Sequence, residues 1–309
     1  MSATPASATL SRPPGLDVAL LAVAVLAIST SGPLIAACTA PALAIAFWRT
    51  ALGSAATSGW VAWRHRAEVR ELTGAQWRLM ALSGLLLGAH FATWVPSLRF
   101  TTVASSTALV ATQPVWAALI ARRRGVQIDR TAWIGIAIAL AGVLVLTGID
   151  FALTPRALIG DGLALAGAVL AALYVTVGER VRATTTTPTY TMVCYAVAGV
   201  ALLGLVVLLR VPLVGFSTRD WMLILAITLG AQLLGHSVVN RVLATTSATV
   251  VSLAILLEMP GSTLIAAAWL GQIPPVAVIP AVVLLFIGIA LVISTTTRAT
   301  DPPSETPPA

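Results

Sequence analysis

The sequence predicts an all-α membrane protein whose ten transmembrane helices form two five-helix inverted repeats. Three observations lead to this fold class: the composition, the spacing of the apolar runs and an internal repeat. Of the 309 residues, 58% are hydrophobic and only 9% are charged, whereas soluble domains carry roughly 25% charged residues. A water-soluble chain of this length has no interior large enough for so much apolar surface, so lipid must surround it.

Ten apolar runs have about the 20 residues that a helix needs to cross a bilayer. They cover residues 16–37, 41–63, 77–98, 103–121, 130–149, 158–180, 188–209, 220–240, 246–269 and 275–294. Only helices and closed barrels satisfy the backbone in lipid, and runs of this length and apolarity indicate helices. The segments 1–15 and 295–309 are rich in small polar residues and proline, and we expect them to be disordered.

The positions of the arginines predict the orientation in the membrane. All 18 basic residues are Arg, and the net charge is +7. With the N-terminus inside, 13 arginines fall on the cytoplasmic side and 4 on the other, while Arg49 lies within the second run. Arg-rich loops stay cytoplasmic, so we expect a multi-pass protein of the inner or plasma membrane with both termini in the cytoplasm. Arginines spread over short loops also argue against nucleic-acid binding.

The two predicted repeats, residues 16–149 and 158–294, share residues at fixed separations. Matching residues 142 positions apart are Gly88 with Gly230 and Arg99 with Arg241, and those 146 apart are Pro114 with Pro260, Gly125 with Gly271, and Gly142 with Gly288. Five spans per half place the two halves in opposite orientations. Inverted repeats of this kind bind their substrate near the midplane of the membrane.

Several segments resemble the EamA-type exporters of the drug/metabolite transporter superfamily, over about residues 16–294. They are PALAIAFWRTALG, the hairpin SLRFTTVASSTALV, the proline-centred ATQPVWAAL and LLEMPGSTL, and the glycine-rich GIAIALAGVLVL and VVLLFIGIALVI. The resemblance implies export of small metabolites, often amino acids or their relatives, by alternating access. Members often carry an arginine at the position of Arg49 without sharing a substrate, which favours a structural anchor there over a clamp for a substrate carboxylate.

Polar side chains inside predicted spans are candidates for substrate binding, because they usually face the interior of the bundle. On the third run, His90, Trp94 and Ser97 share one helical face. On the eighth run, Gln232 and His236 share another, and the separation of 142 residues relates His90 to Gln232. The alternative role for these residues is hydrogen bonding between helices that only holds the bundle together.

Glu258 is the acidic residue placed deep in a predicted span. An apolar environment favours the neutral form of a carboxyl group, so Glu258 is a candidate for proton coupling or for binding an amine. A structural pair with Arg49 or with a histidine is the alternative.

Prolines mark weak points in three spans. Pro33, Pro114 and Pro260 remove a backbone donor within apolar runs. Such breaks in matching halves point to a transport site. Gln113, beside Pro114, and Tyr174, on the sixth run, complete the predicted lining of the site.

The sequence contains no phosphate-binding glycine loop, no HExxH and no pair of carboxylates on one helical face. We therefore predict no enzyme, no metal and no cofactor, and a transporter that uses an ion gradient, with protons as candidates, or runs downhill. The leading prediction is a secondary exporter of small metabolites such as amino acids. An uptake permease for a small polar metabolite is the alternative, and an intramembrane enzyme that uses Glu258 with a histidine ranks below both.

Overall fold

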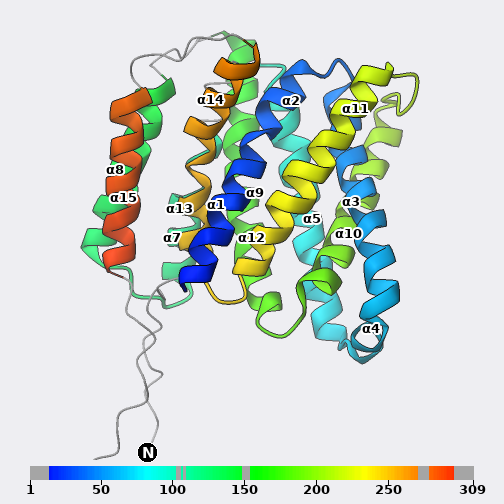
Figure 1. The fold of residues 1–309 in the computed structure, drawn as a ribbon, viewed down its shortest axis with the longest axis horizontal. Helices are drawn as coiled ribbons and strands as arrows, with labels where there is room; N and C mark the ends of the chain where they lie inside the picture. Colours follow the sequence, from blue (N-terminus) through cyan, green and yellow to red (C-terminus); the bar gives the residue numbers. More distant parts are fainter. Residues whose placement is uncertain (1–13, 102–105, 107–108, 148–153, 271–277, 296–309) are drawn as a thin grey trace, which may run out of the picture.

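The computed structural model describes residues 14–101, 106, 109–147, 154–270 and 278–295. Every regular element in these ranges is a helix, so the all-α prediction is confirmed. Most of the helices run side by side along one direction, with the connecting turns at the two ends of the bundle (Figure 1). Residues 1–13 and 296–309, most of the tails predicted to be disordered, lie outside the described residues.

Helices occupy part or all of each predicted apolar run. In the first half they are α1 (Gly15–Ser29), α2 (Ser31–Ala37), α3 (Ala42–Arg64), α4 (Arg66–Glu71), α5 (Gly74–Ser97), α7 (Gln113–Arg123) and α8 (Arg130–Thr147). In the second half they are α9 (Pro155–Arg182), α10 (Thr187–Leu208), α11 (Thr218–Ile227), η1 (Thr228–His236), α12 (Ser237–Val242), α13 (Ala248–Ile255), α14 (Glu258–Leu270) and α15 (Val278–Ser294).

Five helical stretches are long and apolar enough to cross a membrane. They are Gly15–Ala37, Gly74–Ser97, Pro155–Arg182, Thr187–Leu208 and Thr218–Val242. The other predicted runs contain helices that are shorter, such as α7 and α13, or less apolar, such as α3. The structure thus supports a multi-pass membrane protein.

Two groups of helices build the buried core. In the larger group, α5 packs against α9 and α10, α10 packs against α3, and α1 packs against η1. The smaller group joins α8 and α15, which stand side by side at one edge of the bundle (Figure 1). A Cβ atom added at Gly135 would lie 2.7 Å from the carbonyl oxygen of Gly288, and glycine therefore lets these two helices approach closely.

New helices begin just before the three prolines of interest. Pro33 lies in the first turn of α2, Pro114 in the first turn of α7 and Pro260 in the first turn of α14. Proline is tolerated there because the first-turn nitrogens have no partner within the helix. As a result, Gln113 and Glu258 occupy the first positions of two half-helices.

The eighth run differs from a regular α-helix because its middle, η1, is a π-helix. The carbonyl oxygen of Gln232 accepts a hydrogen bond from the backbone nitrogen of Ser237, five residues later, and lies 3.3 Å from the hydroxyl of Tyr195. The wider turn changes the directions of the side chains. Gln232 and His236, expected on one α-helical face, therefore contact different partners.

Candidate functional site

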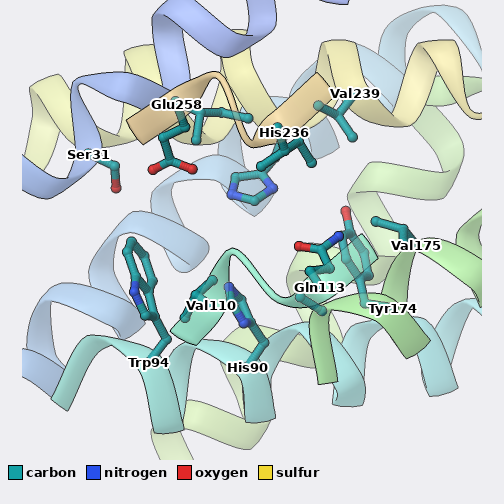
Figure 2. Close-up of a pocket in the computed structure, with 13 residues that line it drawn as sticks. Ser31, His90, Trp94, Val110, Gln113, Tyr174, Val175, His236, Val239 and Glu258 are labelled. Atoms are coloured by element: carbon teal, nitrogen blue, oxygen red, sulfur yellow. The ribbon is translucent and has the colours of Figure 1, made fainter. Parts of the chain in front are cut away.

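A cavity of about 50 Å³ lies among side chains from both halves of the chain (Figure 2). Six of the eight predicted substrate-binding residues line it: His90, Trp94, Gln113, Tyr174, His236 and Glu258. Pockets that bind drug-sized ligands usually enclose about 300–1,000 Å³. The cavity is therefore closed around a space suited to a few water molecules, and a substrate needs a wider conformation to enter.

The other two predicted residues, Ser97 and Gln232, support the site from outside the cavity. The hydroxyl of Ser97 donates to the carbonyl oxygen of Trp94 at 2.6 Å and lies 2.6 Å from the hydroxyl of Ser106. Gln232 accepts a hydrogen bond through Oε1 from Nε of Arg49 at 3.0 Å. Both residues are buried, and their contacts fix neighbouring residues of the site.

His90 and Trp94 form an aromatic wall on α5. Nδ1 of His90 lies 2.9 Å from the carbonyl oxygen of Gly167 on α9, so this nitrogen carries the hydrogen. In the neutral ring, Nε2 is then left as an acceptor. The ring of Trp94 lies parallel to that of His90, with 5.7 Å between the ring centres and 7° between the planes. Figure 2 shows both rings on one side of the cavity.

Glu258 faces this wall from the opposite side (Figure 2). It begins α14, and the positive end of a helix dipole favours a carboxylate. Within the described ranges, no ion pair under 4.0 Å involves Glu258. The structural pair with Arg49 or a histidine, which was the alternative role, is therefore not formed there by direct contact, although Arg49 is close enough to attract the carboxylate.

Arg49 is fully buried behind the cavity wall. Its Nε donates to Gln232, its Nη1 donates to Oγ of Ser31 at 3.2 Å, and its guanidinium carbon lies 4.4 Å from the centre of the Phe91 ring. A buried charge needs such compensation. Nη2 has no hydrogen-bond partner among the residues described. Since Ser31 lines the cavity, Arg49 lies one side chain away from it.

Two stretches of the chain, residues 14–148 and 158–294, match the EamA-like transporter family. The chain belongs to this family. The resemblance inferred from the sequence is thereby confirmed. A crystal structure described only as that of a protein is similar, with a TM-score of 0.73 at 20% identity over 89% of this chain and 96% of that one. At this identity the likeness shows the fold alone, and no curated protein matches the chain.

The remaining polar groups in the cavity of this EamA-family protein are oriented by neighbouring helices. The hydroxyl of Tyr174 donates to Oδ1 of Asn240 at 2.7 Å, and Nε2 of Gln113 donates to the hydroxyl of Ser252 at 2.9 Å. The ring of His236 meets Phe91 edge to face at 5.6 Å. A carboxylate opposite an aromatic wall is chemistry suited to a cationic group such as an ammonium. No group of His, Cys, Asp or Glu suited to a metal ion occurs in the described part of the chain.

Sequence reasoning did not single out Ser31 or the apolar residues of the lining. Ser31 lies in the Ser-Thr-Ser run before Gly32-Pro33, and its neighbour Ser29 bonds back to the carbonyl oxygen of Val25 at 2.7 Å. Only Ser31 turns toward Arg49. Valines and isoleucines of the lining look like lipid-facing ones in sequence, so no signal distinguishes them.

Proposed function

We propose that this EamA-family protein is a secondary transporter that exports small metabolites bearing an amine, such as amino acids or related compounds. The observation that supports this most directly is the carboxylate of Glu258, which faces His90 and Trp94 in a cavity shared by both halves. Amino acids also carry a carboxylate, for which Arg49 and Gln232 offer unpartnered donors, Nη2 and Nε2, among the described residues.

Alternating access requires two halves that rock against each other about the site, and helix contacts support an inverted repeat. α5 contacts α9, and the repeat-related pair η1 and α1 are also in contact. Likewise α7 contacts α9 and α14 contacts α1. Pairs of this kind are what a two-fold relation between the halves predicts.

A second sign of two-fold symmetry lies between α8 and α15. A Cβ atom added at Gly142 would lie 2.8 Å from the carbonyl oxygen of Ala281, much as one added at Gly135 would approach Gly288. Shifting both members of the second contact by 146 residues, in opposite directions, produces the first. Reciprocal contacts at the repeat separation support ten spans in two inverted repeats, residues 16–149 and 158–294, with both termini in the cytoplasm of a cell with this protein in its inner or plasma membrane.

Glu258 is the proposed coupling residue. A carboxyl group that faces a closed cavity without an ion pair can bind either a proton or the ammonium group of a substrate. Binding one excludes the other, which links substrate release to proton uptake. A proton gradient then drives export.

Counterflow in proteoliposomes tests the function. Liposomes containing the purified protein are loaded with one of a panel of amino acids, amines or nucleosides, and uptake of the labelled compound is followed at several pH values. We expect saturable exchange of an amine-bearing compound, and exchange that no longer depends on pH in Glu258→Gln. Glu71→Gln, at an exposed carboxylate, is the matched control.

The same assay separates the alternatives. Imposed gradients of either sign distinguish export from an uptake permease by the direction in which coupled flux is faster. A chemically altered product would favour an intramembrane enzyme. The proposal is refuted if the panel gives no protein-dependent flux, or if Glu258→Gln leaves both the rate and its pH dependence unchanged.

A further inference from the structure

Arg182, at the end of α9, is buried without an ionic partner. Its side chain is 7% exposed. Nε donates to the backbone carbonyl oxygen of Asn240 at 2.9 Å, whereas Nη1 is buried with no hydrogen-bond partner in the described part of the protein. A buried guanidinium normally has an acceptor for each donor, because an unmade hydrogen bond to a charged group costs several kcal/mol.

Two further buried polar groups beside Arg182 also lack partners. They are Nδ2 of Asn240, a residue with no exposed surface, and the hydroxyl of Thr185, three positions after Arg182. The amide of Asn240 is oriented by Tyr174, whose hydroxyl donates to Oδ1, so the NH₂ group is the end left free. Unpaired buried groups in native proteins usually indicate an unseen water or ion.

The local charge favours an anion over water. The guanidinium of Arg241, next to Asn240, is close enough to Arg182 to repel it. Glu68 is the carboxylate that attracts Arg182, but its oxygens accept hydrogen bonds from Thr186 at 2.7 and 2.5 Å and it forms no ion pair with Arg182 within the described ranges.

A cation at a helix C-terminus is favourable by itself, and this explains why an arginine ends α9. It does not explain why Nη1 of Arg182 and Nδ2 of Asn240, both donors, are enclosed together without an acceptor. One acceptor with a negative charge would satisfy both groups and reduce the repulsion between the guanidinium groups.

We propose that Arg182, Asn240 and Thr185 form a binding site for one small anion, assisted by the charge of Arg241. The donors are Nη1, Nδ2 and the hydroxyl, and the anion is either an inorganic ion such as chloride or the carboxylate group of a metabolite. Because Asn240 also binds the hydroxyl of Tyr174, the site is connected by one residue to the cavity. The site stands apart from Glu258 and from proton coupling.

Thermal unfolding of the purified full-length protein in detergent tests the site without measuring transport. Sodium gluconate, whose anion is too large for an enclosed site, is replaced stepwise by sodium chloride or sodium acetate at constant ionic strength. A ligand that binds the folded state raises Tm in a saturable way. We expect such a rise with at least one of the two anions. A response to chloride identifies an inorganic anion, and a response to acetate alone identifies a carboxylate.

Two variants localise the effect. Arg182→Gln is expected to weaken the anion by about tenfold or more, which corresponds to losing a charged hydrogen bond. Arg180→Gln, at an exposed arginine in the same turn, is the control and should respond like the wild type. Thr185→Val keeps shape and removes only the unpartnered hydroxyl, so it should fold and bind the anion several-fold more weakly.

The proposal is overturned if neither anion gives a saturable rise in the wild type. It is also overturned if Arg182→Gln and Thr185→Val both fold and respond to the anion as the wild type does. Since no flux is measured, this result and that of the counterflow assay are independent, and either proposal can fail alone.

Discussion

The loop between α2 and α3 and the loop between α9 and α10 are held in the same way at opposite ends of the bundle. Asp220 accepts hydrogen bonds from the backbone nitrogen and the hydroxyl of Thr39, at 2.7 and 2.8 Å. Glu68 accepts the same two bonds from Thr186, at 2.7 and 2.5 Å. Each threonine lies two residues before a proline at the start of the next helix. We call these contacts the Asp220 clamp and the Glu68 clamp.

Around the cavity the two halves differ. The first half provides His90, Trp94 and Gln113, whereas the second provides the carboxylate of Glu258 and the π-helix that carries His236. Repetition thus preserves the framework, as the clamps and the contacts between α8 and α15 indicate, while the chemistry of the cavity is divided between the halves. The predictions below test that contrast.

The largest effect is expected from moving the carboxylate to the other half. Glu258→Gln should lower the exchange rate by about 10–100-fold, since a charged hydrogen bond of about 1.5–3 kcal/mol is lost. Adding Gln113→Glu restores the charge at the matching helix start but breaks the bond to Ser252. We expect the double variant to stay impaired in the counterflow assay. Full recovery would mean that the two halves are chemically interchangeable.

The shared framework predicts equal costs at reciprocal glycines. In Gly288→Ala the new Cβ atom would lie 2.5 Å from the carbonyl oxygen of Gly135, and Gly135→Ala creates the reverse clash at 2.7 Å. Overpacking of this kind costs about 1–3 kcal/mol, so both variants should lower Tm by similar amounts. Gly204→Ala is the control, because nothing lies within 4 Å and alanine is the better helix former. A lower Tm for Gly204→Ala, or none for the other two, would contradict the contact.

The parts of the site that follow helical spacing were predictable from sequence. His90 and Trp94 are four residues apart on α5, and α5 is a regular helix, so the predicted shared face leads both into the cavity. Gln232 and His236 have the same spacing, but the π-helix directs Gln232 to Arg49 instead. Nothing in the spacing of polar residues indicates a wider helical turn.

Contacts between distant residues were not predictable. Thr39 and Asp220 are 181 residues apart, and each alone looks like a polar residue near a helix end. Ser31 gained its role only because Arg49 turns inward rather than toward the membrane surface. The fold class follows from properties that every span shares, whereas these roles depend on single pairings that a pattern does not encode.

The Asp220 clamp can be probed through a native cysteine. Cys38 precedes Thr39 and is 1% exposed, and burial raises the pKa of its thiol to about 11, so we expect slow reaction with a maleimide at neutral pH. Asp220→Asn weakens the clamp and should speed labelling of Cys38 by about tenfold. Glu68→Gln weakens the opposite clamp and should slow it, since alternating access opens one side at a time. Mass spectrometry distinguishes Cys38 from the buried Cys194, and equal labelling in both variants would contradict the coupling.

The smallest expected effect is the pH dependence of the Glu68 clamp. Partial burial tends to raise the pKa of Glu68, but hydrogen bonds from Thr186 and Thr189, with His65 nearby, outweigh it, so the pKa lies below the usual range of a glutamate. A lowered pKa in the folded state means stability that is present above the unfolded value, near 4.3, and is lost as the pH falls through the folded value. The difference in Tm between wild type and Glu68→Gln should therefore stay constant from pH 7 to about 5 and shrink below that. A difference that grows on acidification would show that Glu68 is not held as a carboxylate by the α9–α10 loop.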